Sequence, residues 1–162
     1  MTAKDVIRYV VESCYSITRD YVSDLNDRDL LVRSVPQTNH IAWTLGHLIT
    51  SAHQMLTQLG HAPPPLPANF VESHTKEAAT SDDPAKFFRK TDYLEWMEKM
   101  KAATLAAIDA TAERDLDRPG PESMREYAPT VGAVLTLLGT HWLMHAGQFV
   151  PIRRKLGKPA LY

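Results

Sequence analysis

Apolar residues recur at every third or fourth position in four segments of the chain, the spacing that places them on one face of an α-helix. These segments cover residues 3–24, 40–59, 84–112 and 130–156, and Gly60 ends the second. No segment alternates apolar and polar residues as a half-buried strand does. The pattern therefore predicts an all-α fold, and we expect a four-helix bundle.

Two long connections separate these helices. Residues 61–83 and 113–129 are rich in proline and polar residues, so we expect loops with short helical turns. The first is long enough to run back along the bundle, which allows a long crossover connection in place of simple up-down order. A chain of 162 residues fits one domain, residues 1–162, with a single core.

Local signals predict where the helices begin and where one is interrupted. Thr2 and Asp5 have the spacing of a capping box, and Asn39 is the expected N-cap of the second helix. Pro84 suits the first position of the third helix. Pro151 lies inside the fourth segment, where a proline removes a backbone hydrogen bond, so we expect a bend or a break there.

The charge and cysteine content exclude several classes of function. With 18 Lys and Arg against 19 Asp and Glu, the net charge of −1 provides no field that would attract nucleic acid. Cys14 is the single cysteine and lies on the apolar stripe of the first helix, so we expect it to pack in the core. No apolar run is long enough for a signal peptide or a membrane span, and we expect a soluble, cytoplasmic protein.

His141 and His145 are the most informative polar residues of the fourth helix. Residues four apart share one helical face, and two imidazoles at this spacing can bind one ion. The zinc-protease motif, which has a glutamate after the first histidine, is excluded because Trp142 follows His141. The alternative is that both are core-edge histidines satisfied by hydrogen bonds.

His47 is a candidate third ligand, because it lies within the second helix and follows Gly46, which would let a neighbouring helix approach closely. Three neutral imidazoles leave positions open for water and suit Zn²⁺, Ni²⁺ or Fe²⁺ better than Mg²⁺ or Ca²⁺. The remaining four histidines are expected in solvent; they are His40, His53, His61 and His74.

Other residues near these histidines have competing interpretations. Gln148 points the same way as His145 and could bind a metal-bound water or a substrate, or support a ligand from behind. We interpret Trp43 and Trp142 as core residues that exclude water. Arg153 and Arg154 are expected to be a solvated helix end that interacts with the helix dipole.

The order of these elements resembles the DinB-like family, also called YfiT-like metalloenzymes. The resemblance rests on "WTLGHL" in the second helix and "HWLMHAGQFVPIRR" in the fourth, and it spans nearly the whole chain. It implies a four-helix bundle that binds a divalent metal through His47, His141 and His145. Relatives in this family include thiol S-transferases and a thiol-dependent isomerase. Pro151 departs from the family, in which an apolar residue compatible with a helix is more common.

Two hypotheses about function follow. The first is a metal-dependent enzyme acting on a small molecule, either a thiol-dependent S-transferase that uses a low-molecular-weight thiol or a small hydrolase. No carboxylate shares the histidine face of the fourth helix, which favours chemistry in which the metal alone activates the nucleophile. The alternative is a non-enzymatic bundle that binds a metal or a small ligand.

The first helix also predicts an association. Apolar residues occupy two adjacent lines, one through Val6 and Val10 and another through Ile7, Val11 and Tyr15, which is wider than one core requires. Together with the resemblance, this favours a symmetric homodimer centred on the second line. The alternative is that the second line packs beneath residues 61–69.

Overall fold

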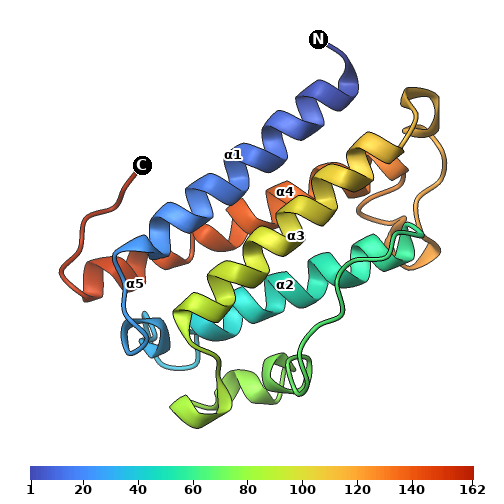
Figure 1. Ribbon diagram of the computed structural model, residues 1–162. Coiled ribbons are helices and arrows are strands. Elements are labelled where there is room, and N and C mark those ends of the chain that lie inside the picture. The colour runs from blue at the N-terminus through green and yellow to red at the C-terminus, as the bar shows by residue number, and fades with distance from the viewer.

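Four long helices and one short helix make up the protein, which the computed structural model describes over residues 1–162 without any strand. The all-α prediction and the four-helix bundle are therefore confirmed (Figure 1). The helices are α1 (Ala3–Ser23), α2 (Ile41–Gln58), α3 (Lys90–Ala110), α4 (Val131–Ala146) and α5 (Phe149–Lys155).

The bundle contains a crossover connection between its second and third helices. Figure 1 shows α1 and α4 running in one direction and α2 and α3 in the opposite direction. Because α2 and α3 are parallel, residues 59–89 must return along the length of the bundle, as predicted. This connection contains three short 3₁₀ turns, η2 (Glu72–His74), η3 (Ala78–Thr80) and η4 (Pro84–Lys86).

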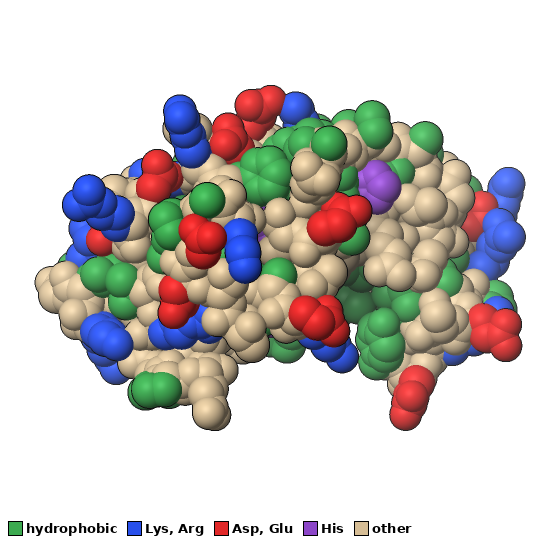
Figure 2. All heavy atoms as spheres, turned by 90° about the horizontal axis from the view of Figure 1, so that it is seen from below, with side chains coloured by type: hydrophobic (Ala, Val, Ile, Leu, Met, Phe, Trp, Pro, Cys, Tyr) green, Lys and Arg blue, Asp and Glu red, His purple; other side chains and the backbone are tan.

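The helices α2 and α4, which carry the three histidines of interest, are neighbours in the bundle. α1 packs along α4 and α3, and α2 packs along α3 and touches α4 over a shorter stretch. No helix combines the length and the apolar character needed to cross a lipid bilayer. On the face drawn in Figure 2, acidic and basic side chains are interspersed rather than gathered by sign.

The starts of two helices differ from the prediction. α2 is capped by His40 rather than Asn39, because His40 Nδ1 accepts a hydrogen bond from the Trp43 backbone N–H at 3.1 Å. α3 begins at Lys90 rather than Pro84. Residues Pro84–Lys86 form one turn, and the chain is then extended at Phe87, whose ring packs edge-on against the His40 ring at 4.6 Å. The tertiary contact thus replaces the continuation of the helix.

The predicted interruption of the fourth segment is a break. α4 ends at Ala146, and α5 starts at Phe149 after Gly147 and Gln148. Pro151 is the third residue of α5, where a backbone N–H has no partner within its own helix, so the proline costs no hydrogen bond there. The break lies just after His145 and directs Gln148 back toward it.

The second apolar line of α1 is part of the core. Ile7, Val11 and Tyr15 are buried, and a Cβ atom added at Gly139 of α4 would lie only 2.8 Å from Val11 Cα. A dimer centred on Val11 is therefore wrong, and so is the alternative of a cover formed by residues 61–69. The homodimer itself stays a prediction, for which Val6 and Tyr9 are the exposed apolar residues of α1.

Arg153 corrects another expectation, because it is completely buried rather than solvated. Its guanidinium donates to the Tyr21 carbonyl at 2.7 Å and to Asp24 Oδ1 at 2.6 Å. The hydrogen bond from Arg153 lowers the pKa of Asp24 to about 2. These contacts fix α5 to the end of α1, whereas Arg154 is exposed as predicted.

Candidate metal centre

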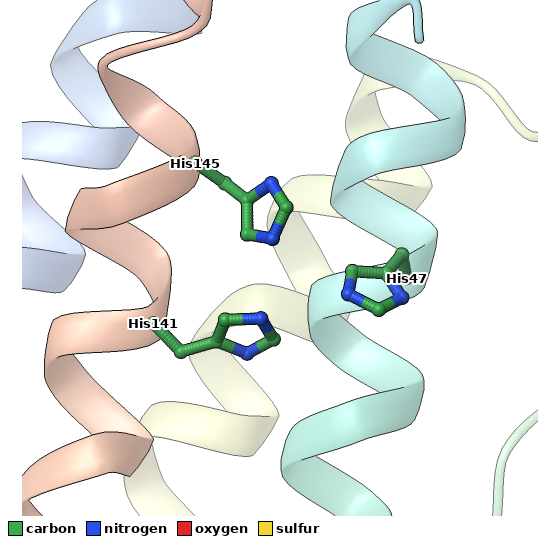
Figure 3. Close-up of side chains that lie close together, drawn as sticks. All are labelled: His47, His141 and His145. Atoms are coloured by element: carbon green, nitrogen blue, oxygen red, sulfur yellow. The ribbon is translucent and has the colours of Figure 1, made fainter. Parts of the chain in front are cut away.

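Three histidine rings meet between α2 and α4 (Figure 3). His47 extends from α2, and His141 and His145 extend from successive turns of α4. One nitrogen of each ring can be chosen so that all three lie within 4.8 Å of one another. The ring centroid of His47 lies 5.3 Å from that of His141 and 5.2 Å from that of His145. The structure thus brings together the three residues predicted as ligands, and metal binding by them stays a prediction.

The orientation of His141 follows from the neighbouring Trp142. Trp142 is buried and packs against Tyr15 of α1, with ring centroids 4.5 Å apart, so this side of α4 faces the core. The preceding residue is rotated by about 100° around the helix. His141 is therefore turned toward α2, and the prediction that Trp142 is a core residue is confirmed.

His47 is held in place by Trp43, one turn earlier in α2. The two rings stack with an interplanar angle of 5° and centroids 5.2 Å apart. Trp43 is buried, as expected, and its indole N–H donates to the Thr75 carbonyl at 2.8 Å. The crossover connection therefore fixes the ring against which His47 packs, a role that the sequence did not indicate.

Gln148 supports His145 from behind. Gln148 Oε1 lies 3.1 Å from His145 Nδ1, so the imidazole donates its Nδ1 proton to the amide oxygen. This hydrogen bond selects the tautomer in which Nε2 carries the lone pair. Of the two interpretations of Gln148, the contact favours support of a ligand over direct binding of a cofactor.

The surroundings favour the neutral form of all three rings. Burial, followed by the neighbouring His145 and His47, lowers the pKa of His141 to about 4. Burial also lowers the pKa of His47 and that of His145. Since only a neutral imidazole offers a lone pair, protons compete weakly for these nitrogens at neutral pH.

Two other histidines are buried, which corrects the expectation that they are in solvent. His74 donates from Nδ1 to the Phe70 carbonyl at 2.6 Å and accepts at Nε2 from the Tyr93 hydroxyl at 2.8 Å. His40 is fully buried, and its Nε2–H donates to the Ser81 carbonyl at 3.1 Å. These partners come from the crossover connection and the start of α3, so helical periodicity could not reveal them.

Gly46 has a different role from the predicted approach of a neighbouring helix. A Cβ atom added at Gly46 would lie 1.9 Å from Cδ2 of the His74 ring. The missing side chain therefore makes room for an imidazole of the crossover connection. Because Gly46 directly precedes His47, His74 packs against the backbone that carries this candidate ligand.

A pocket of about 550 Å³ opens beside His47 and His141, on the side of the connection between α3 and α4. α2 forms one wall, α4 forms another, and residues of the connection close the third side. The lining residues are His47, Ser51, Gln54, Met55 and Gln58 of α2, Leu137, His141 and Met144 of α4, and Ser123, Met124 and Tyr127 of the connection.

Comparisons with known proteins agree with this architecture. The sequence profile of the DinB superfamily matches residues 11–149. The fold is similar to that of a conserved protein from Enterococcus faecalis, with a TM-score of 0.76 over 98% of this chain and 99% of that chain, at 17% sequence identity. No curated protein sequence matches the chain. Because the profile covers most of the chain, including all three histidines, the protein belongs to the DinB superfamily.

Proposed function

We propose that His47, His141 and His145 hold a divalent transition-metal ion, and that the protein is a metal-dependent enzyme whose small-molecule substrate occupies the adjacent pocket. The observation that carries the proposal is that the rings of His47 and His141 face that of His145 without a hydrogen bond to any protein group. Small rotations of the side chains would bring the three nitrogens within about 2.1 Å of one ion, the usual distance for zinc and imidazole.

The composition of the site supports Zn²⁺, Ni²⁺ or Fe²⁺ as the ion. All three ligands are imidazoles, which suit these borderline metals, whereas Mg²⁺ and Ca²⁺ require oxygen ligands. Three protein ligands also leave positions for a substrate. When bound, such an ion lowers the pKa of a thiol or of water and polarises a carbonyl group.

Thiol-dependent S-transfer is the reaction class that the pocket supports best. No aspartate, glutamate or lysine lines the pocket, so the chain offers no carboxylate or amine as a general base. A free thiol has a pKa of about 8.5, far below that of water, and therefore needs less help from a base than water does. His47 and His141 would face the reacting sulfur, while Gln148 would keep Nε2 of His145 available. Hydrolysis is the second candidate within the same site.

Metal analysis and a thiol conjugation assay test this proposal together. Protein purified without a histidine tag should contain about one transition-metal ion per chain. Metal-loaded protein should accelerate the reaction of a low-molecular-weight thiol with 1-chloro-2,4-dinitrobenzene, and protein treated with a chelator should not. Stoichiometric metal without acceleration of this reaction or of p-nitrophenyl acetate hydrolysis would favour the non-enzymatic binding bundle. Absence of metal would contradict the metal-dependent enzyme and would leave a non-enzymatic bundle that binds a small ligand.

A further inference from the structure

The pocket beside the histidines has no charged side chain in its lining. Lys, Arg, Asp and Glu make up 23% of the chain, yet none of the eleven lining residues belongs to these types. The polar lining residues other than the histidines are hydroxyls and amides, namely Ser51, Gln54 and Gln58 on α2 and Ser123 and Tyr127 on the connection between α3 and α4.

Most hydrogen-bonding groups of the lining come from α2 and most apolar groups come from elsewhere. Ser51, Gln54 and Gln58 belong to α2, whereas Leu137 and Met144 belong to α4, and Met55 and Met124 add apolar surface. A bound molecule can therefore place hydrogen-bonding groups toward α2 and apolar groups toward α4. Glutamine amides both donate and accept, so they match amides and hydroxyls without favouring either sign of charge.

The pocket is long enough to contact a molecule well beyond its reacting atom. His47 and Gln58 are eleven residues apart on α2, which corresponds to about 16 Å along the helix. At the far end, the Ser123 hydroxyl lies 3.3 Å from Gln58 Oε1 and links the connection to α2. Three polar side chains of α2 line the pocket at increasing distance from His47, namely Ser51, Gln54 and Gln58.

We infer that this pocket selects small molecules that are uncharged and rich in amide or hydroxyl groups beyond the reacting end, and that it discriminates against carboxylates. A carboxylate that lies in the pocket beyond the histidine end loses part of its hydration and finds no cationic side chain there, whereas an amide or hydroxyl finds Ser51, Gln54 or Gln58. Only the choice of the histidine end as the reacting end rests on the proposed function.

Two peptides that differ in a single charge test this inference. Acetyl-Cys-Gly-Gly with a free carboxylate and the same peptide with a C-terminal amide share the thiol, so any attraction of the thiol to the histidine end is common to both. The charge lies two residues from the sulfur, too far to bind the same ion easily. Isothermal titration calorimetry on metal-loaded wild-type protein should give about fivefold tighter binding of the amide, since the pocket is partly open to water.

Charged substitutions at Gln54 test whether the charge of the pocket lining sets the preference between the two peptides. The Gln54 side chain is exposed and makes no hydrogen bond within the chain, so we expect substitution to leave the fold intact. Gln54→Arg should strengthen binding of the carboxylate peptide and reverse the preference, and Gln54→Glu should weaken binding of the same peptide further. Ser16→Arg, which adds the same charge at an exposed position of α1, should keep the wild-type preference.

The outcomes separate this inference from the proposed function. Metal content is measured on the same samples, so a chain without metal contradicts the metal site whichever peptide binds. Equal affinity for the two peptides, tighter binding of the carboxylate by wild-type protein, or binding of neither peptide would each overturn the inference. A shift in preference with Ser16→Arg as large as that with Gln54→Arg would also overturn it, because the effect would then come from the overall charge.

Discussion

Two groups of histidines in this bundle are both buried or half-buried, and they differ in whether their nitrogens have partners. In the group beside the crossover connection, His40 and His74 use both ring nitrogens in hydrogen bonds to the chain. In the group between α2 and α4, His47 and His141 have no such bond, and His145 has one. The first group is satisfied by the fold alone, whereas the second presents lone pairs to a shared space.

This difference separates a structural role from a binding role better than burial does. Burying an imidazole without partners costs free energy. At His74 the hydrogen bonds to the Phe70 carbonyl and the Tyr93 hydroxyl offset that cost. His47 and His141 are half-buried and have no hydrogen-bond partner within the chain, so solvent or a bound ligand must supply their partners. The proposed metal ion would supply an interaction that the chain itself does not provide to these rings.

The largest expected effect is the loss of metal from the second group. His141→Ala removes one of three proposed ligands and should weaken metal binding at least about a hundredfold, since loss of a mere supporting residue typically costs 10–100-fold. The helical circular dichroism should stay near that of the wild type. Competition with a chromophoric chelator measures the affinity.

The matched control for this variant is His53→Ala, which removes a half-buried histidine of α2 that is not in the cluster. It should leave the affinity unchanged. Equal losses in the two variants, or no loss in His141→Ala, would contradict the ligand assignment.

The converse result is expected for the first group. His74→Ala leaves the Tyr93 hydroxyl without its partner and opens a cavity beside Gly46, and it should lower the free energy of unfolding by about 3 kcal/mol. Urea unfolding measures the change. His61→Ala, at a half-buried position in the connection, should change stability by less than about 0.5 kcal/mol.

Metal stoichiometry should survive the His74→Ala substitution. A variant that folds and yet loses its metal would show that His74, through Gly46, contributes to the site as much as to the fold. The comparison between the two groups would then fail.

In metal-free protein, acidification should lower the free energy of unfolding through the buried His74. Burial lowers the pKa of His74 to about 4 from its ordinary value of 6.5, so the unfolded chain binds a proton at a pH where the folded chain does not. The contribution of neutral His74 to the free energy of unfolding is therefore fully present above about pH 6.5, and it is lost as the pH falls toward 4. Between pH 7 and pH 5 this residue alone should account for about 2 kcal/mol.

The measurement for this prediction is urea unfolding of wild type and His74→Ala at several pH values, with a chelator present. The variant should show a smaller loss of stability on acidification than the wild type. Identical slopes would show that His74 does not titrate as its burial indicates.

Much of the fold could be predicted from sequence because it depends on local periodicity. The four amphipathic stripes and the shared face of His141 and His145 follow from the regular geometry of helices, and the length of residues 61–83 allows the crossover connection. His47 was found because it also lies within a regular helix. That it meets the other two rings depends on the packing of α2 against α4, which the structure supplies.

The wrong expectations share a physical cause, which is contact between residues distant in sequence. Arg153 is buried because the end of α1 provides Asp24 and a backbone carbonyl 129 or more positions away. His74 is buried because Tyr93 and Gly46 lie beside it. The start of α3 is displaced because Phe87 packs on His40. Propensity and periodicity carry no information about such partners.

The smallest expected effect concerns Gln148, the one residue that gives a member of the second group a partner. Its amide oxygen fixes the tautomer of His145, so Gln148→Leu should weaken metal binding about tenfold, at the low end for a supporting residue. Gln148 is exposed, so the free energy of unfolding should not change measurably. Gln148→Glu keeps an acceptor at the same place and should bind the metal at least as tightly as the wild type.

Chelator competition on the three proteins distinguishes the explanations, because an equal loss in both variants would mean that the side-chain amide acts by some route other than accepting the Nδ1 proton. Full affinity in Gln148→Leu would mean that the packing of α4 against α2 orients His145 unaided, and the two groups of histidines would then differ even more sharply than the hydrogen bonds indicate.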